Sequence, residues 1–87
     1  MTIAQMTISD RLRAMELAES RFADLVLGGD LRGWPPSELA AAIDLTNQHK
    51  RLAVDAITRR CYPQALSNID TVIAIMGVFI DDDLRLN

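Results

Sequence analysis

The sequence contains few of the residues that carry chemistry. Among its 87 residues it has one cysteine, Cys61, and one histidine, His49. A single cysteine excludes a disulfide within the chain and is typical of a reducing compartment, so we expect a cytoplasmic protein. Neither residue has a base or metal-ligand partner at a suitable spacing nearby. We therefore expect no catalytic site, no metal site and no cofactor.

Aromatic residues and excess positive charge are also scarce. Aromatic residues make up 5% of the sequence, and the formal net charge is -3. An acidic chain lacks the broad basic surface that binds phosphate, which disfavours nucleic acid as a partner. Arg59 and Arg60 lie at the end of an expected helix, but Asp55 interrupts the basic stripe that Arg51 and Arg59 would otherwise form. A small DNA-binding regulator is therefore kept only as a second alternative.

Uncharged hydrophobic sequence is limited to one segment. Residues 64–80, QALSNIDTVIAIMGVFI, carry a single formal charge, Asp70. As a helix, residues 69–80 rise about 18 Å, less than the ~30 Å hydrocarbon core of a membrane. The first ten residues lack the basic start and the long apolar core of a signal peptide. We expect neither a membrane span nor export by that route.

Helical periodicity is the main pattern that the sequence does contain. No region alternates apolar and polar residues with β-branched enrichment, so we predict an all-α fold and a single domain over residues 1–87. Ser9 is a suitable N-cap, Gly28 and Gly29 suit a helix C-terminus, and Pro63 suits a helix start. The expected segments are a flexible leader over 1–8, helices at about 10–27, 36–60 and 63–80, and an acidic tail over 81–87. They predict a three-helix antiparallel bundle, or a helical hairpin plus a C-terminal helix, as a monomer or a homodimer.

The third expected helix has two neighbouring apolar rows. One row consists of Leu66, Ile69, Ile73, Met76 and Ile80, and the other of Ala65, Val72, Ile75 and Phe79. One row suffices to pack a helix against one neighbour, so the second row requires an additional neighbour. Either the chain's own helices or another protein covers it. The burial of Val72, Ile75 and Phe79 decides between these two arrangements.

We expect the chain to act by binding another protein. The candidate contact residues are Trp34, Arg59, Arg60, Val72, Ile75, Phe79, Asp81, Asp82 and Asp83. Trp34 is alternatively a hydrophobic staple with Leu39 at the start of the second helix, or part of the core. The three aspartates are alternatively a solvated charge run that ends the third helix.

The function that fits these features best is an inhibitor or adaptor of the kind that phages and mobile elements encode, which occupies a surface on a larger complex. A secretion-type chaperone or a small structural subunit is the first alternative. The helix, glycine-proline turn and helix over about residues 10–60 are similar in layout to small type III secretion needle subunits and their chaperones. This layout carries no diagnostic motif, and the resemblance implies a helical hairpin that assembles with other proteins.

Overall fold

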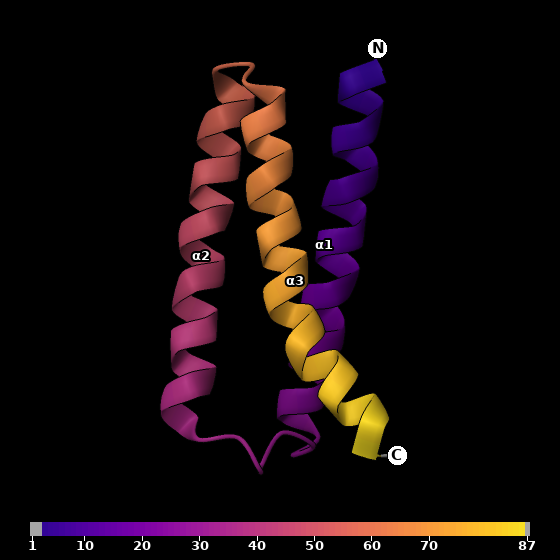
Figure 1. Ribbon diagram of the computed structural model, residues 1–87, viewed down its shortest axis with the longest axis vertical. Helices are drawn as coiled ribbons and strands as arrows, with labels where there is room; N and C mark the ends of the chain where they lie inside the picture. The colour runs from indigo at the N-terminus through magenta and orange to yellow at the C-terminus, as the bar shows by residue number, and fades with distance from the viewer. Residues whose placement is uncertain (1–2, 87) are drawn as a thin grey trace.

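The computed structural model describes the backbone of residues 3–86 and the side chains of residues 7–80. It contains three helices, α1 (Ile3–Leu27), α2 (Pro36–Thr58) and α3 (Tyr62–Leu86), and no strand in the described residues. Consecutive helices run in opposite directions in an elongated molecule of 42 × 23 × 17 Å (Figure 1). The prediction of an all-α helical bundle is confirmed.

The third helix, α3, is the central element of the bundle. It packs against both α1 and α2 and lies between them in Figure 1. Within the described backbone, no Cα atom of α1 comes within 8 Å of a Cα atom of α2. The close packing of the bundle is therefore that of α1 on α3 and of α2 on α3.

The core explains how α3 buries both of its apolar rows. Ile69 and Val72 are fully buried, and Met76 and Phe79 are 2% and 5% exposed. Ile75 is half-buried and packs against the same cluster. The chain's own helices thus cover the second row, and a self-contained bundle accounts for Val72 and Phe79.

Small residues form the centre of the α2 face that packs in the core. Ala42, Ala53 and Ala56 are buried there, whereas the larger Ile43, Leu45 and Leu52 are 43%, 45% and 42% exposed. Helical periodicity places all six on one apolar arc of α2, but only the three alanines are buried. The reason is geometric, because at 100° per residue the large side chains lie at the two edges of the arc and the alanines at its centre.

Polar side chains of α3 pair with side chains of α1 and of α2 at the edges of the core. Asp70, the one charge in the apolar segment, lies 3.4 Å from Arg11 of α1, measured from Oδ1 to Nη1. Asn68 Oδ1 lies 2.8 Å from His49 Nδ1 of α2. His49 therefore makes a hydrogen bond that links α2 to α3.

The first helix begins earlier than its local signals predict. α1 starts at Ile3, so most of the segment expected to be a flexible leader is helical, and Ser9 lies inside the helix. Ile8 is buried in a small cluster with Ala56 of α2 and Ala65 of α3. This packing stabilises the additional turns, and a cap signal at Ser9 contains no information about it.

The third helix also continues further than predicted. α3 passes through Asp81, Asp82 and Asp83 and ends at Leu86, where the sequence predicts an acidic tail outside the helix. Aspartate in a helix interior costs only about 0.7 kcal/mol relative to alanine, so a short acidic run does not by itself end a helix.

By length and composition, the segment Tyr62–Ile80 meets the requirement for a membrane-spanning helix. Its mean hydropathy is 1.4, and 33% of it is buried inside the bundle. Central helices of bundles are often as apolar as this one, since they contact neighbours on several sides. The expectation that the chain spans no membrane stays a prediction.

Candidate protein-binding surface

The residues that the sequence puts forward for partner binding do not form one surface. Val72 and Phe79 lie in the core, so they hold the chain's own helices together and have little surface for a partner. Ile75 is half-buried beside them. Asp81, Asp82 and Asp83 come after residue 80, the last residue whose side chain the structure describes.

Trp34 belongs to an aromatic cluster at one end of the bundle. Its ring meets Phe79 edge-on at a centroid distance of 4.7 Å, and Phe79 meets Phe22 of α1 in the same way at 5.2 Å. Trp34 and Leu39 both pack against the main core. Of the two interpretations of Trp34, the structure therefore favours packing over an exposed anchor.

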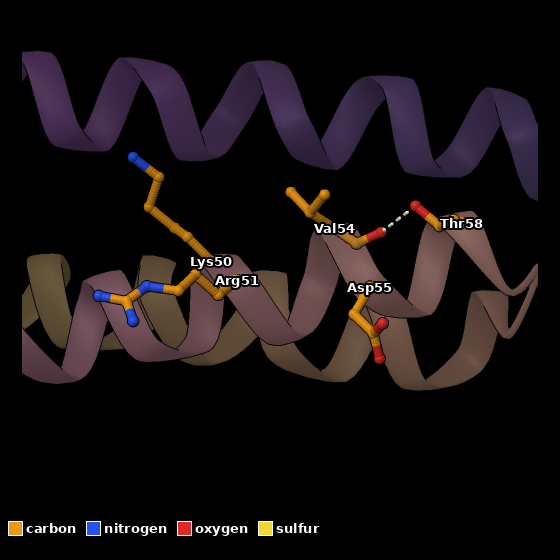
Figure 2. Close-up of a pocket in the computed structure, with 5 residues that line it drawn as sticks. All are labelled: Lys50, Arg51, Val54, Asp55 and Thr58. Carbon is orange, nitrogen blue, oxygen red and sulfur yellow. Dashed lines mark hydrogen bonds between the residues drawn. The ribbon is translucent and has the colours of Figure 1, made fainter.

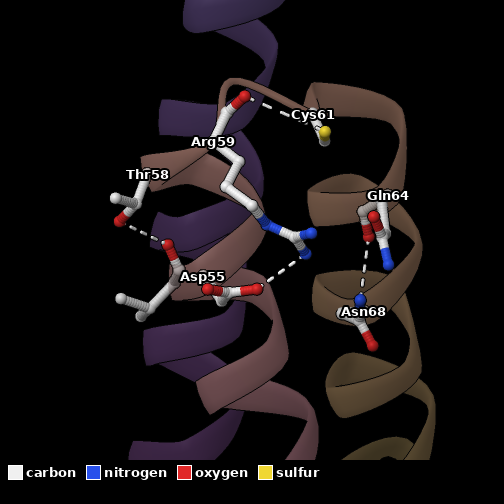
Figure 3. A network of polar contacts seen from close by, with 7 residues as sticks. Asp55, Thr58, Arg59, Cys61, Gln64 and Asn68 are labelled. Carbon is white, nitrogen blue, oxygen red and sulfur yellow. Dashed lines mark hydrogen bonds and ion pairs between the residues drawn. The ribbon is translucent and has the colours of Figure 1, made fainter.

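Arg59 and Arg60 lie at the opposite end of the bundle, in the turn between α2 and α3. Arg59 Nη2 is 2.6 Å from Asp55 Oδ2, one turn earlier on α2 (Figure 3). In the same turn, Cys61 is exposed, and its thiol donates a weak hydrogen bond of 3.9 Å to the Arg59 carbonyl. Both side chains of this ion pair are more than half exposed, so it is a surface contact worth about 0 to 1 kcal/mol.

Two hollows that the sequence does not single out lie on α2, one lined by α2 alone and one shared with α1 and α3. One hollow of about 410 Å³ is lined by Lys50, Arg51, Val54, Asp55 and Thr58. A second hollow of about 150 Å³ is lined by Glu19, Phe22, Ile43, Thr46, Asn47 and Met76. We call these two hollows together the α1–α2 groove; residues of α1 line the smaller one, and residues of α2 alone line the larger one.

An ion pair connects the two helices across this groove. Lys50 Nζ of α2 lies 3.0 Å from Glu19 Oε1 of α1, which shows that this side of α2 faces α1. Lys50 and Val54 rise toward α1 in Figure 2, whereas Asp55 points away from it. At 100° per residue, Ile43, Lys50 and Val54 lie within about 40° of one another around α2.

Apolar side chains are left exposed along the groove. Val54 is 63% exposed and Ile43 is 43% exposed. The sequence does contain a signal for this arrangement in the alanines of α2. Small residues at a helix interface allow close approach of two backbones, so Ala42, Ala53 and Ala56 favour close packing of α2 on α3 at the expense of contact with α1.

The described residues contain no other arrangement with evident chemistry. Within them, no three histidine, cysteine, aspartate or glutamate side chains come together as metal ligands. Comparison with protein-family models, with curated proteins and with solved structures found no match. The α1–α2 groove is therefore the candidate binding site within the described residues.

Proposed function

We propose that this chain is a non-enzymatic binding protein that takes up another protein along the α1–α2 groove. The observation that carries the proposal is that no Cα atom of α1 lies within 8 Å of one of α2 in the described backbone, while Ile43 and Val54 are exposed beside the two hollows. A helical or extended segment of a partner placed there would bury both side chains. An inhibitor or adaptor that acts in the cytoplasm would use the groove in this way.

The ion pair across the groove does not prevent such binding. The side chains of Lys50 and Glu19 are 40% and 27% exposed. Exposed ion pairs contribute about 0 to 1 kcal/mol, so separating this pair costs little. Charged groups at the rim would then orient the partner, because rim charges act mainly on the rate and the specificity of association.

Two valines of similar exposure provide a test of which face is used. Val54 lies in the groove and is 63% exposed, whereas Val78 is 55% exposed on α3. Val78 lies about 180° around α3 from the buried Ile69, so it faces away from the groove. A photo-crosslinking amino acid at position 54 should capture a discrete protein in the native host, and the same amino acid at position 78 should not.

The identity of the captured protein separates the alternatives. A different protein captured from position 54 supports an inhibitor, an adaptor or a chaperone, and its known assembly distinguishes these three. Capture of a second copy of the chain assigns the groove to a homodimer instead. Equal capture from both positions, or capture from position 78 alone, contradicts the groove as the binding surface.

Purified partner then allows a quantitative measurement. Val54→Asp should weaken binding at least about tenfold, because it places a charge in an apolar contact, and Val78→Asp should leave the affinity unchanged. Isothermal titration calorimetry measures both affinities.

A further inference from the structure

We propose that two copies of this chain form a two-fold symmetric dimer through the outer edge of α2, on the side opposite the α1–α2 groove. The contact surface consists of four residues spaced seven apart, Glu38, Leu45, Leu52 and Arg59, which we call the α2 stripe. Residues seven apart stay on one side of a helix and drift by about 20° per repeat, which suits two helices that cross at a shallow angle. The α2 stripe lies outside the groove and takes a different partner, so the dimer goes beyond the proposed function.

The two leucines of the α2 stripe are exposed and lie away from the groove. Leu45 and Leu52 are 45% and 42% exposed. Leu45 is nine residues from Val54, and Leu52 is nine residues from Ile43, which corresponds to about 180° around the helix. A partner bound in the groove therefore does not cover the leucines.

Charges of opposite sign lie at the two ends of the stripe. Glu38 is exposed in the first turn of α2. Arg59 is the C-cap residue, and its ion pair with Asp55, four residues earlier, shows that its side chain continues the register of the helix. Along α2, the stripe thus consists of an acid, two leucines and a base.

This order of residues is complementary to itself when one helix is reversed. Two α2 helices can lie antiparallel about a two-fold axis midway between the leucines. Leu45 then packs against Leu52 of the second copy, and Glu38 lies opposite Arg59 of the second copy. Each of these contacts occurs twice, as a two-fold interface requires.

A second pair of opposite charges selects the same orientation. Asp44 and Arg51 are exposed and are also seven residues apart, so they lie together on one flank of the stripe. In the antiparallel dimer, Asp44 lies about 3 Å along the helix axis from Arg51 of the second copy. In a parallel pair each charge would face its own counterpart, and like charges would repel. The charge pattern therefore points to a second, antiparallel copy of this chain as the occupant.

Charge exchange tests the pairing in the intact chain. Glu38→Arg and Arg59→Glu each place like charges opposite each other, so each variant should dimerise about tenfold more weakly than the wild type. An equimolar mixture of the two variants should form a heterodimer, and the double variant Glu38→Arg/Arg59→Glu should dimerise as the wild type does, because both restore opposite charges. Sedimentation equilibrium over a range of concentrations measures all four. A wild-type chain that stays monomeric, or a double variant that dimerises no better than the single variants, overturns the proposal.

Two aspartate substitutions on opposite sides of α2 locate the interface. Leu45→Asp should leave the chain monomeric, because it places a charge in the apolar centre of the contact. Val54→Asp is the matched control in the groove and should leave the dimer unchanged. Circular dichroism checks that both variants remain folded. A dimer that survives Leu45→Asp, or one that is lost in Val54→Asp, contradicts the α2 stripe as the interface.

The dimer and the proposed function fail separately. If the chain is monomeric while position 54 captures a different protein, the dimer is refuted and the groove stands. If the chain dimerises through the α2 stripe while position 54 captures nothing, the groove fails and the dimer stands. Val78 lies on α3, ten residues from the Asn68 that bonds His49 beside the middle of the stripe, and so about 15 Å along the bundle from the symmetry axis. The crosslinking control at position 78 therefore lies outside the α2 stripe.

Discussion

Gly29 and Arg60 occupy equivalent positions, each two residues after the last residue of its helix. Glycine suits the backbone conformation at this position better than arginine does. Both have left-handed backbones, with φ of 76° and 60°. In each case the next amide donates to a carbonyl in the last turn of the helix: Asp30 N to Leu25 O at 3.0 Å, and Cys61 N to Ala56 O at 2.8 Å. Glycine adopts this conformation without steric cost, whereas a residue with a Cβ atom is strained by about 1 kcal/mol.

Exchanging the residue types at these two positions should therefore change stability in opposite directions. We expect Arg60→Gly to raise the free energy of unfolding by about 0.5 to 1 kcal/mol, and Gly29→Ala to lower it by about 1 kcal/mol. A Cβ at position 29 would lie 3.4 Å from Arg32 Nε, which is an ordinary contact, so the cost comes from φ. Urea denaturation measures both, and a less stable Arg60→Gly would show that the arginine side chain contributes more than its backbone costs.

Thr46 lowers the stability of the free protein. Its hydroxyl is buried and unpaired among the described residues, and such a group costs about 1 to 3 kcal/mol. We expect Thr46→Val to raise the free energy of unfolding by about 1 kcal/mol, because valine has the same shape and no hydroxyl. Thermal denaturation followed by circular dichroism measures the change against Thr58→Val, which removes an exposed, bonded hydroxyl. A destabilised Thr46→Val would contradict an unpaired hydroxyl.

Among the helices, α3 contributes most to the packing because it contacts both of the others. Near its C-terminal end, Phe79 joins Phe22 of α1 to Trp34 of the connection between α1 and α2. This contact closes one end of the bundle, since the residue holds a neighbouring helix and a connecting segment at the same time. Packing against Phe79 is therefore the structural role of Trp34, the only tryptophan of the sequence.

Removing this ring should loosen the end of the bundle. Phe79→Ala is expected to cost about 3 to 5 kcal/mol, the usual range for a buried aromatic, and to shift Trp34 fluorescence to longer wavelength as the indole becomes hydrated. Leu27→Ala is the control, because Leu27 is 86% exposed, and it should change stability by less than about 0.5 kcal/mol. Urea titration monitored by Trp34 fluorescence measures both. An unchanged spectrum in Phe79→Ala would contradict the packing of Trp34 on Phe79.

For the bundle as a whole, substitutions at three valines distinguish the buried core from the exposed surface. Val72 is fully buried, whereas Val54 and Val78 are 63% and 55% exposed. Val72→Asp should cost at least about 4 kcal/mol and prevent folding, because it buries an unpaired charge in the core. Val54→Asp and Val78→Asp should each stay within about 0.5 kcal/mol of the wild type.

Circular dichroism and urea denaturation of the three variants measure this difference. The result also validates the two exposed variants for binding experiments, since a loss of binding then cannot come from unfolding. A folded Val72→Asp variant would refute α3 as the central helix. A marked loss of stability in Val54→Asp would show that the groove is closed in the free protein.

The all-α class, the presence of three helices and the end of α1 follow from local features of the chain. Apolar periodicity identifies the helices, the glycine pair marks the end of α1, and Pro63 marks the start of α3, which begins at Tyr62. The two apolar rows of α3 also predict that it contacts more than one neighbour. These properties depend on residues close together in sequence, so periodicity and end signals report them.

The candidate surface depends instead on the distance between α1 and α2, which no local pattern contains. That distance results from how closely the alanines of α2 approach α3 and from contacts such as Ile8 with Ala56 and Ala65, which join all three helices. The same long-range packing extends α1 to Ile3 and buries Val72 and Phe79, and it leaves Ile43 and Val54 exposed. Helical periodicity shows which residues share a side of a helix, whereas the spacing between helices determines which of those sides is covered.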